Sequence, residues 1–327
     1  MNKIYVFDLA RGFASFMLVL NHYLLHCETY GLSDSIAGTP IFYFISGFVI
    51  SMSFERQSIK KFLIKRLFRL YPVIFFMYFI LFFVMMVIKH QAKVNGVDVD
   101  VKNIIMNIFF IPHFFPSNNS KLTDILYVGP MWTICIDFTF YLILILTKSI
   151  KSQKNKIIFI VFFNLFLIYV MTKINEIYHI YGTMLSVLYY LLSVYFGMLV
   201  YYLSQNYITK KCFIILAICI LYPLFFDNTY CRYVIGGLTM LYLFTYHKEL
   251  GNNKIVLFFA HISYPMFLLH SIFPNLIFSH SSVCLKDREW YYFPILYISM
   301  IPICYFIYRF IEEPMNKFGR RITQNMK

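Results

Sequence analysis

Three ionisable residues interrupt the first long apolar stretch of the chain. The segment "FDLARGFASFMLVLNHY", residues 7–23, carries Asp8, Arg11 and His22. On a helix, the three side chains share a stripe about 60° wide, and Arg11 and His22 lie about 16 Å apart along the axis. Since a charge facing lipid is costly, the stripe must face other helices or a water-filled path. Imidazole is a common acid–base group near neutral pH, so the stripe indicates proton transfer or substrate handling.

Packing explains the same residues in another way. Asp8 and Arg11 are spaced i, i+3, which suits a buried ion pair that joins helices. His22 alone could be a histidine whose hydrogen bonds are satisfied inside the bundle. The spacing leaves both explanations open.

A second charged group begins the third apolar stretch. Arg66 and Arg69 are three residues apart and share one helix face. Paired guanidinium groups suit phosphates, although anionic lipid head groups would explain them equally well. Glu313, near the end of the chain on the same expected side, could brace the two arginines. The alternative is an exposed glutamate at a helix end.

Polar residues also line one face of the fourth apolar stretch. Thr133, Asp137 and Tyr141 follow the spacing i, i+4, i+8. An aspartate in an apolar helix needs a partner, so Asp137 is expected to brace His22 or to bind hydroxyl groups of a substrate. In "FISGF", Ser46 and the following glycine allow a backbone to approach closely, either around a ligand or between packed helices.

Composition indicates which elements must position these residues. Of 327 residues, 60% are hydrophobic and 13% are charged, far fewer charges than in a soluble domain. A helix needs about 20 apolar residues to cross a bilayer, so the sequence predicts an all-α, polytopic membrane protein with about ten spanning helices. The expected segments are residues 4–26, 39–54, 70–89, 129–147, 157–172, 183–203, 212–226, 232–246, 257–279 and 291–311.

The basic residues indicate an orientation. With both termini in the cytoplasm, the inner segments hold more than twice as many Lys and Arg residues as the outer ones. The net charge of +14 is therefore a topology signal, and no nucleic-acid partner is expected. Residues 1–315 are expected to form one membrane domain with an outer loop at 90–128, followed by a short basic cytoplasmic tail at 316–327. The apolar part of that loop is too short to span and suits a re-entrant or interfacial segment.

The seven cysteines include no C-x-x-C pair and no metal-ligand spacing. Most lie in apolar stretches and are expected to act as small hydrophobic residues, so no metal site is predicted. A disulfide among the three expected on the outer side stays open (Cys27, Cys231 and Cys284).

Six motifs, in order from residue 7 to residue 314, resemble those of the acyltransferase family 3 membrane proteins. Arg11, ten intervening residues and His22 resemble the R-x10-H signature, and Asp137 stands where the family commonly has glutamate. The six matching segments are "FDLARG" at 7–12, "FYFISGFVIS" at 42–51, "RLFRLYP" at 66–72, "MWTICIDFTFY" at 131–141, "ISYPMFLLH" at 262–270 and "IEEP" at 311–314.

The resemblance implies transfer of an acyl group, usually acetyl, from cytoplasmic acetyl-CoA to a glycan hydroxyl such as one of O-antigen, capsule or exopolysaccharide. His22 would be the general base or the covalent acyl carrier, with Asp137 and Asp8 in the catalytic group. The donor would meet Arg11, Arg66, Arg69 and Glu313, and the acceptor would meet Trp132, Tyr141, Ser46 and His270.

The expected location is the bacterial inner membrane, with the lipid bilayer, acetyl-CoA and a glycan acceptor as partners. A homo-oligomer, the sugar, the acylated position and the acyl group stay open. One alternative is a transporter or flippase of a lipid-linked glycan, although no internal repeat of the kind found in transporters is visible. Another is a non-catalytic subunit of a glycan assembly, which would not need His22.

Overall fold

The computed structural model is almost entirely helical, which confirms the expected all-α class. It describes residues 4–21, 23, 38–83, 93–94, 97–98, 101–109, 131–178, 183–227, 230–270, 273 and 292–326. Within them, the only strands are β1 (Lys93–Val94) and β2 (Val97–Asp98), which pair antiparallel in the segment expected as an outer loop.

Each of the ten expected segments overlaps a described helix. The helices are α1 (Tyr5–Leu20), α2 (Gly38–Glu55), α3 (Ile59–Phe83), α4 (Val101–Ile108), α7 (Met131–Leu146), α8 (Gln153–Tyr178), α9 (Thr183–Ser204), α10 (Lys210–Phe225), α11 (Cys231–Tyr246), α12 (Lys254–Leu269), α14 (Tyr292–Ile307) and α15 (Glu313–Gln324). The short helix α4 is the described part of the apolar stretch in the expected outer loop. A π-helical turn, η4 (Tyr308–Glu312), joins α14 to α15.

Several of these helices have the length and composition of membrane spans. Among the described residues, four helices are long and apolar enough to cross a bilayer: Ile59–Phe83, Gln153–Ile174, Leu185–Ser204 and Phe293–Gln324. The chain therefore has the apolar helices of a membrane protein, while ten crossings and the orientation of the termini stay predictions.

The chain divides into two compact units, which are described separately. Unit 1 comprises residues 1–7, 36–59 and 133–250, and unit 2 comprises residues 8–35, 60–132 and 251–327.

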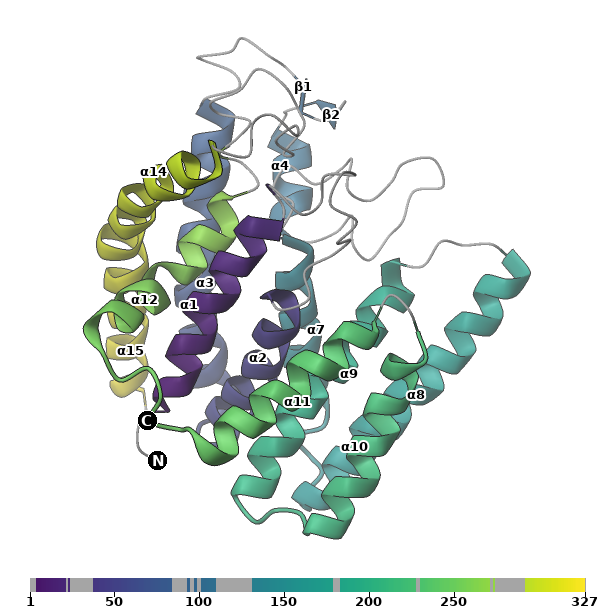
Figure 1. Cartoon of the computed structure of the whole chain (residues 1–327). Helices are drawn as coiled ribbons and strands as arrows, with labels where there is room; N and C mark the ends of the chain where they lie inside the picture. Colours follow the sequence, from purple (N-terminus) through teal and green to yellow (C-terminus); the bar gives the residue numbers. More distant parts are fainter. Residues whose placement is uncertain are drawn as a thin grey trace. The chain divides into compact units, whose positions relative to one another are not determined.

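In unit 1, α2 and α9 lie side by side at close range, with α11 next to them (Figure 1). Two glycines set that distance. A Cβ atom on Gly47 would meet the backbone carbonyl of Val194, and a Cβ atom on Gly197 would meet the carbonyl of Phe44. Small residues of this kind allow helix backbones to approach closely in a membrane protein.

Unit 1 also carries an exposed apolar surface on α8. Large apolar side chains remain between 47% and 63% exposed along this helix, at Phe159, Phe162, Phe163, Phe166 and Tyr169. In water such a surface would be a liability, whereas facing lipid tails it costs nothing. The exposed aromatic residues are therefore consistent with the membrane span at Gln153–Ile174.

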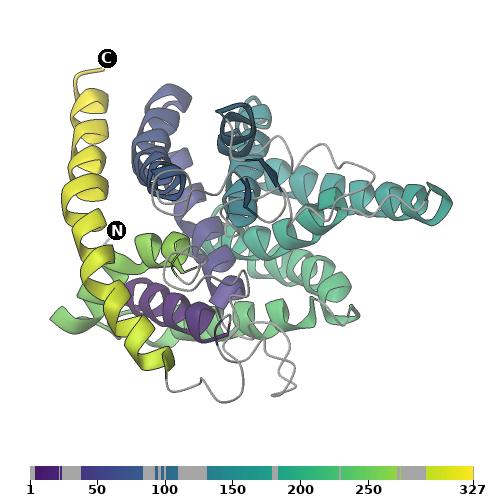
Figure 2. The same ribbon diagram turned by 90° about the horizontal axis from the view of Figure 1, so that it is seen from above.

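In unit 2, α14, η4 and α15 form one continuous rod, drawn in yellow in Figure 2. Its last part packs on α3, since a Cβ atom on Gly319 would lie 2.7 Å from the Cβ atom of Phe68. The ring of Phe68 also meets that of Phe318 edge to face, with centroids 5.3 Å apart. Most of the segment expected as a tail is thus helical and packed against α3.

The start of α3 differs from the expected span. The helix begins at Ile59, well before residue 70, and its basic first half precedes Pro72. Lys, Arg and Leu are good helix formers, so a charged segment next to an apolar span continues the helix. Arg66 and Arg69 therefore lie within α3, two and one turns before the proline.

Candidate active site

The helix α1 carries the first part of the predicted stripe. Asp8 and Arg11 lie on α1 in unit 2, and Ser15 is buried with its hydroxyl donating to the carbonyl of Gly12 at 2.9 Å. The packing alternative, a direct ion pair between Asp8 and Arg11, is not formed in the part of the chain that the structure describes. His22 lies outside the described residues, so its role stays a prediction.

Arg11 lies close enough to four other charged groups for their charges to act on it. These are the positive groups of Arg66 and Arg69 and the negative groups of Asp8 and Glu312. Arg66 is buried, and its guanidinium lies 5.4 Å from the centre of the Phe62 ring. We call Arg11, Arg66 and Arg69 the arginine cluster. The structure thus brings together the three arginines that the sequence analysis selected.

Contacts beside these arginines fix the helices that carry them. Gly12, next to Arg11, lies against α12, where an added Cβ atom would be 3.2 Å from the Cβ atom of Phe259. The carbonyl of Leu70, next to Arg69, accepts a hydrogen bond from the hydroxyl of Tyr264 on α12 at 3.2 Å. The same helix α12 therefore braces both α1 and α3 at the height of the cluster.

The two adjacent glutamates, Glu312 and the predicted Glu313, differ in their surroundings. Glu313 forms ion pairs with Arg309 at 2.5 Å and Lys317 at 2.8 Å, along the same rod of helix. Glu312 is only 7% exposed, and the charges of Arg69 and Arg11 act on it. Successive helical residues point about 100° apart, so only one of the two glutamates can face the arginines. The signal was present in the sequence, because the motif I-E-x-P aligns its glutamate with Glu312.

A second polar group lies in unit 1, between α2 and α7. The hydroxyl of Ser46 donates to Oδ2 of Asp137 at 3.3 Å, and the charge of Asp137 acts on Tyr43. Both Ser46 and Asp137 are half-buried. Gly47 beside them approaches the α9 backbone, so helix packing accounts for the glycine. Ser46 and Asp137 retain polar groups suited to a hydroxyl-bearing ligand.

The remaining predicted acceptor residues differ in burial. Tyr141 is 2% exposed, and its ring packs against Phe138 with centroids 5.3 Å apart. Trp132 is half-buried and falls in unit 2, one residue before the segment of unit 1 begins. His270 is 1% exposed, with Nδ1 2.7 Å from the carbonyl of Phe267, so that nitrogen carries a proton.

His270 also accepts a hydrogen bond through its backbone. The hydroxyl of Tyr23, which is fully buried, donates to the His270 carbonyl at 2.7 Å. Tyr23 follows His22 directly in the sequence. The contact fixes the residue after His22 to the end of α12 in unit 2.

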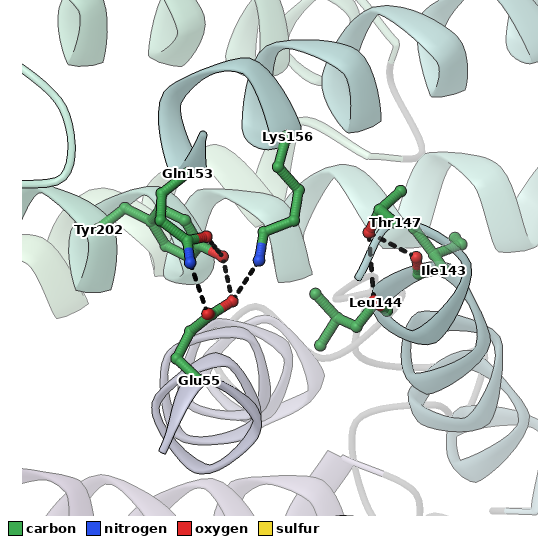
Figure 3. A network of polar contacts seen from close by, with 7 residues as sticks. All are labelled: Glu55, Ile143, Leu144, Thr147, Gln153, Lys156 and Tyr202. Atoms are coloured by element: carbon green, nitrogen blue, oxygen red, sulfur yellow. Dashed lines mark hydrogen bonds and ion pairs between the residues drawn. The ribbon is translucent and has the colours of Figure 1, made fainter. Parts of the chain in front are cut away.

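One buried polar network was missed by the sequence analysis (Figure 3). Lys156 at the start of α8 forms an ion pair with Glu55 at 2.5 Å, and the side chains are 2% and 5% exposed. Tyr202 and Gln153 donate further hydrogen bonds to the same carboxylate, at 2.7 and 2.8 Å. The network joins the ends of α2, α8 and α9 in unit 1. The orientation predicted from basic residues counts Lys156 only as one of the charges of an expected inner segment.

Glu55 ends α2, beyond the apolar segment expected at residues 39–54. Burial raises the pKa of its carboxyl group, but hydrogen bonds from Lys156 and Tyr202 outweigh this and leave the pKa below its ordinary value of 4.5. The carboxylate is therefore charged at neutral pH.

Metal ligation finds no support in the described side chains. No group of three or more His, Cys, Asp or Glu residues among them could hold a metal ion. Besides the Lys156–Glu55 network, the described residues thus hold two polar groups, the arginine cluster in unit 2 and the serine–aspartate pair in unit 1.

Comparison with known proteins gives a match over nearly the whole chain. The sequence model of the acyltransferase 3 family, described as an acyltransferase domain, matches residues 4–309. No curated protein and no solved structure matches.

Proposed function

Because the chain belongs to the acyltransferase 3 family, we propose that it is a membrane-bound O-acyltransferase for a cell-surface polysaccharide or its lipid-linked precursor. The donor is cytoplasmic acetyl-CoA, and the product is an acetyl ester on a sugar hydroxyl of O-antigen, capsule or exopolysaccharide. The enzyme works as a multi-pass protein of the bacterial inner membrane. The observation that carries the donor assignment is the arginine cluster.

The arginine cluster suits the phosphates of coenzyme A. Guanidinium groups bind phosphate oxygens through paired hydrogen bonds, which makes arginine the preferred residue for this task. Among the described residues, Arg11 and Arg69 make no hydrogen bond or ion pair, so their donors are available to a ligand. Positive charge near the cytoplasmic end of the helices would also attract an anionic donor electrostatically.

His22 performs the transfer in this proposal. Its imidazole takes the proton of the sugar hydroxyl while the oxygen attacks the carbonyl carbon of the thioester. The carbon–sulfur bond then breaks, and the departing thiolate receives a proton to give free coenzyme A. A covalent acetyl-histidine that transfers its acetyl group in a second step gives the same products.

Asp137 and Ser46 are assigned to the acceptor. A carboxylate and a hydroxyl side by side can accept from and donate to sugar hydroxyls, which offer both kinds of hydrogen bond. This assignment rests on their 3.3 Å contact and on their partial exposure.

The test compares surface glycan from cells that express the native protein, His22→Ala or the control His247→Ala at matched membrane levels. His247 is exposed at the end of α11, so its loss should leave activity intact. Mass spectrometry should find an added acetyl group per repeat unit with the native protein and the control, and none with His22→Ala. In purified membranes, thiol release from acetyl-CoA should follow the same order.

Other outcomes separate the alternatives. An acetyl content that is equal with and without the native protein would contradict the assignment for that glycan and favour glycan transport. Acetylation that persists in His22→Ala would keep the enzyme and remove His22 from its centre.

A further inference from the structure

The last helical rod of the chain changes character along its length. Residues Phe293–Gln324 form one helical run of 32 residues (Figure 2), whereas about 20 residues are enough to cross the hydrocarbon core of a bilayer. Its first part exposes large apolar side chains as far as Phe306 and Phe310, which are 51% and 65% exposed. Such rings suit lipid tails, so the rest of the rod continues from the core toward the layer of lipid head groups.

Beyond these rings, one side of the rod carries positive charge. Glu313 forms ion pairs with Arg309, one turn before it, and with Lys317, one turn after it. Arg320 and Arg321 follow one turn beyond Lys317 on the same side, and both are exposed. We call Arg309, Lys317, Arg320 and Arg321 the basic ridge. Four positive charges with one negative charge among them leave this side of the rod strongly cationic.

The other side of α15 packs on the protein. Gly319 and Thr323 are buried, and a Cβ atom on Gly319 would lie 2.7 Å from the Cβ atom of Phe68 on α3. The ridge residues of α15 therefore point away from α3. Within the part of the chain that the structure describes, the side chains of Arg320 and Arg321 form no hydrogen bond or ion pair. Their donors are available to a partner outside the chain.

Topology alone does not explain this arrangement. The positive-inside rule concerns how many Lys and Arg residues lie near the end of a span, and it does not depend on which side of a helix carries them. Here the charges follow one another along a single side, directly after the residues that suit lipid tails. Guanidinium and ammonium groups in such a row are complementary to phosphate groups.

We propose that the basic ridge binds the head groups of anionic phospholipids and so anchors α15 at the membrane surface. Lipids whose tails surround Phe306 and Phe310 present their phosphates next to the ridge. Arg321 lies about 16 Å beyond Phe310 along the axis, and long basic side chains can extend back toward the head groups. A zwitterionic head group brings its own positive charge, so an anionic lipid should be preferred. This binding needs only a membrane span and the charges beside it, so it does not depend on the proposed acyl transfer.

The test measures lipid binding to the purified full-length protein in detergent by mass spectrometry of intact complexes. Phosphatidylglycerol is the anionic probe and phosphatidylcholine the zwitterionic one, and the native protein should bind the first more tightly. The double variant Arg320→Gln, Arg321→Gln should lose about tenfold in affinity for phosphatidylglycerol. Arg320→Lys, Arg321→Lys keeps both charges and should retain most of the affinity. The control Lys210→Gln, Lys211→Gln removes two exposed charges at the start of α10 and should bind like the native protein.

A measurement on the native protein adds a check that needs no variant. Raising the salt concentration should weaken the binding of phosphatidylglycerol and leave that of phosphatidylcholine unchanged, because salt screens exposed charges. Equal affinity of the native protein for the two lipids would overturn the proposal. An equal loss of affinity in the control double variant would overturn it too, because the preference would then follow the net charge of the protein.

Coenzyme A distinguishes a soluble phosphate ligand from a lipid. The double variant Arg320→Gln, Arg321→Gln should bind coenzyme A like the native protein. If this variant instead loses affinity for coenzyme A and keeps its affinity for phosphatidylglycerol, the ridge serves the soluble ligand and the lipid assignment is wrong. Acetylation is not measured in any of these comparisons, so the lipid assignment and the proposed function can fail separately.

Discussion

At the scale of single residues, the pair formed by Lys156 and Glu55 combines two buried charges with hydrogen bonds from Tyr202 and Gln153. A buried ion pair gains little over two apolar residues, but a single buried charge left without its partner is costly. The pair therefore matters for the stability of unit 1 mainly because removing either residue alone leaves the charge of the other buried and unpaired.

Lys156→Met should accordingly lower the free energy of unfolding by about 3–5 kcal/mol, because Glu55 is left buried without its cation. The double variant Glu55→Gln, Lys156→Met should recover most of that loss. Thermal unfolding in detergent measures both, with Lys154→Met on the exposed side of α8 as the control. If the double variant loses as much free energy of unfolding as Lys156→Met, the packing of these side chains matters more than their charges.

Acid should weaken the same network. The pKa of Glu55 is lower in the folded protein than its ordinary value of 4.5, so its stabilising effect is complete above that value. The effect is lost as the pH falls through the lower, folded pKa. The melting temperature of the native protein should therefore fall more steeply than that of Glu55→Gln when the pH is lowered below about 4.5. Parallel curves for the two proteins would contradict this linkage.

The residues of the candidate site were partly predictable from the sequence. The charges of Arg11, Arg66 and Arg69 stood out because each interrupts or borders an apolar stretch. Glu312 was missed because two adjacent glutamates carry the same composition signal, and only the turn of the helix decides which one faces inward. His22 stays a prediction.

At the scale of elements, the contact between α2 and α9 depends on glycine. The sequence left open whether the glycine of "FISGF" serves a ligand or helix packing, because the partner helix is not encoded next to it. The structure places the backbone of α9 against Gly47, which decides for packing.

Gly47→Ala should therefore destabilise the protein by about 1–3 kcal/mol, since the new methyl group meets a backbone carbonyl that cannot rotate away. The control is Gly237→Ala on α11, whose methyl group would meet the ring of Phe196 at 2.9 Å. Because a ring can shift, that variant should cost less. Thermal unfolding of both variants in detergent gives the comparison, and equal losses would contradict the argument.

At the scale of the whole molecule, the apolar pattern was the most reliable signal. Every expected span overlaps a described helix, because a long apolar run leaves a chain few alternatives in a membrane. Helix ends were less predictable, as the early start of α3 at Ile59 shows. The grouping into two units follows contacts between distant segments, which composition does not encode.

The ten-helix topology makes a direct prediction about sidedness. Reporter enzymes fused after Asn206, Gly251 and Lys327 should behave as cytoplasmic, because those positions lie in the expected inner segments. A fusion after Asp227 should behave as external. If a fusion at any one of these positions reports the opposite side, the chain must cross the membrane a different number of times before that position.

The glycine contact between α2 and α9 also bears on how the sequence can change over time. Each missing side chain makes room for a carbonyl of the opposite backbone, at Val194 for Gly47 and at Phe44 for Gly197. No substitution can shrink a backbone, so a larger residue at either position has no compensating partner. Among related sequences, the two glycines should therefore stay fixed and not vary together. Methods that find contacts from correlated substitutions would pass over this close approach of α2 to α9.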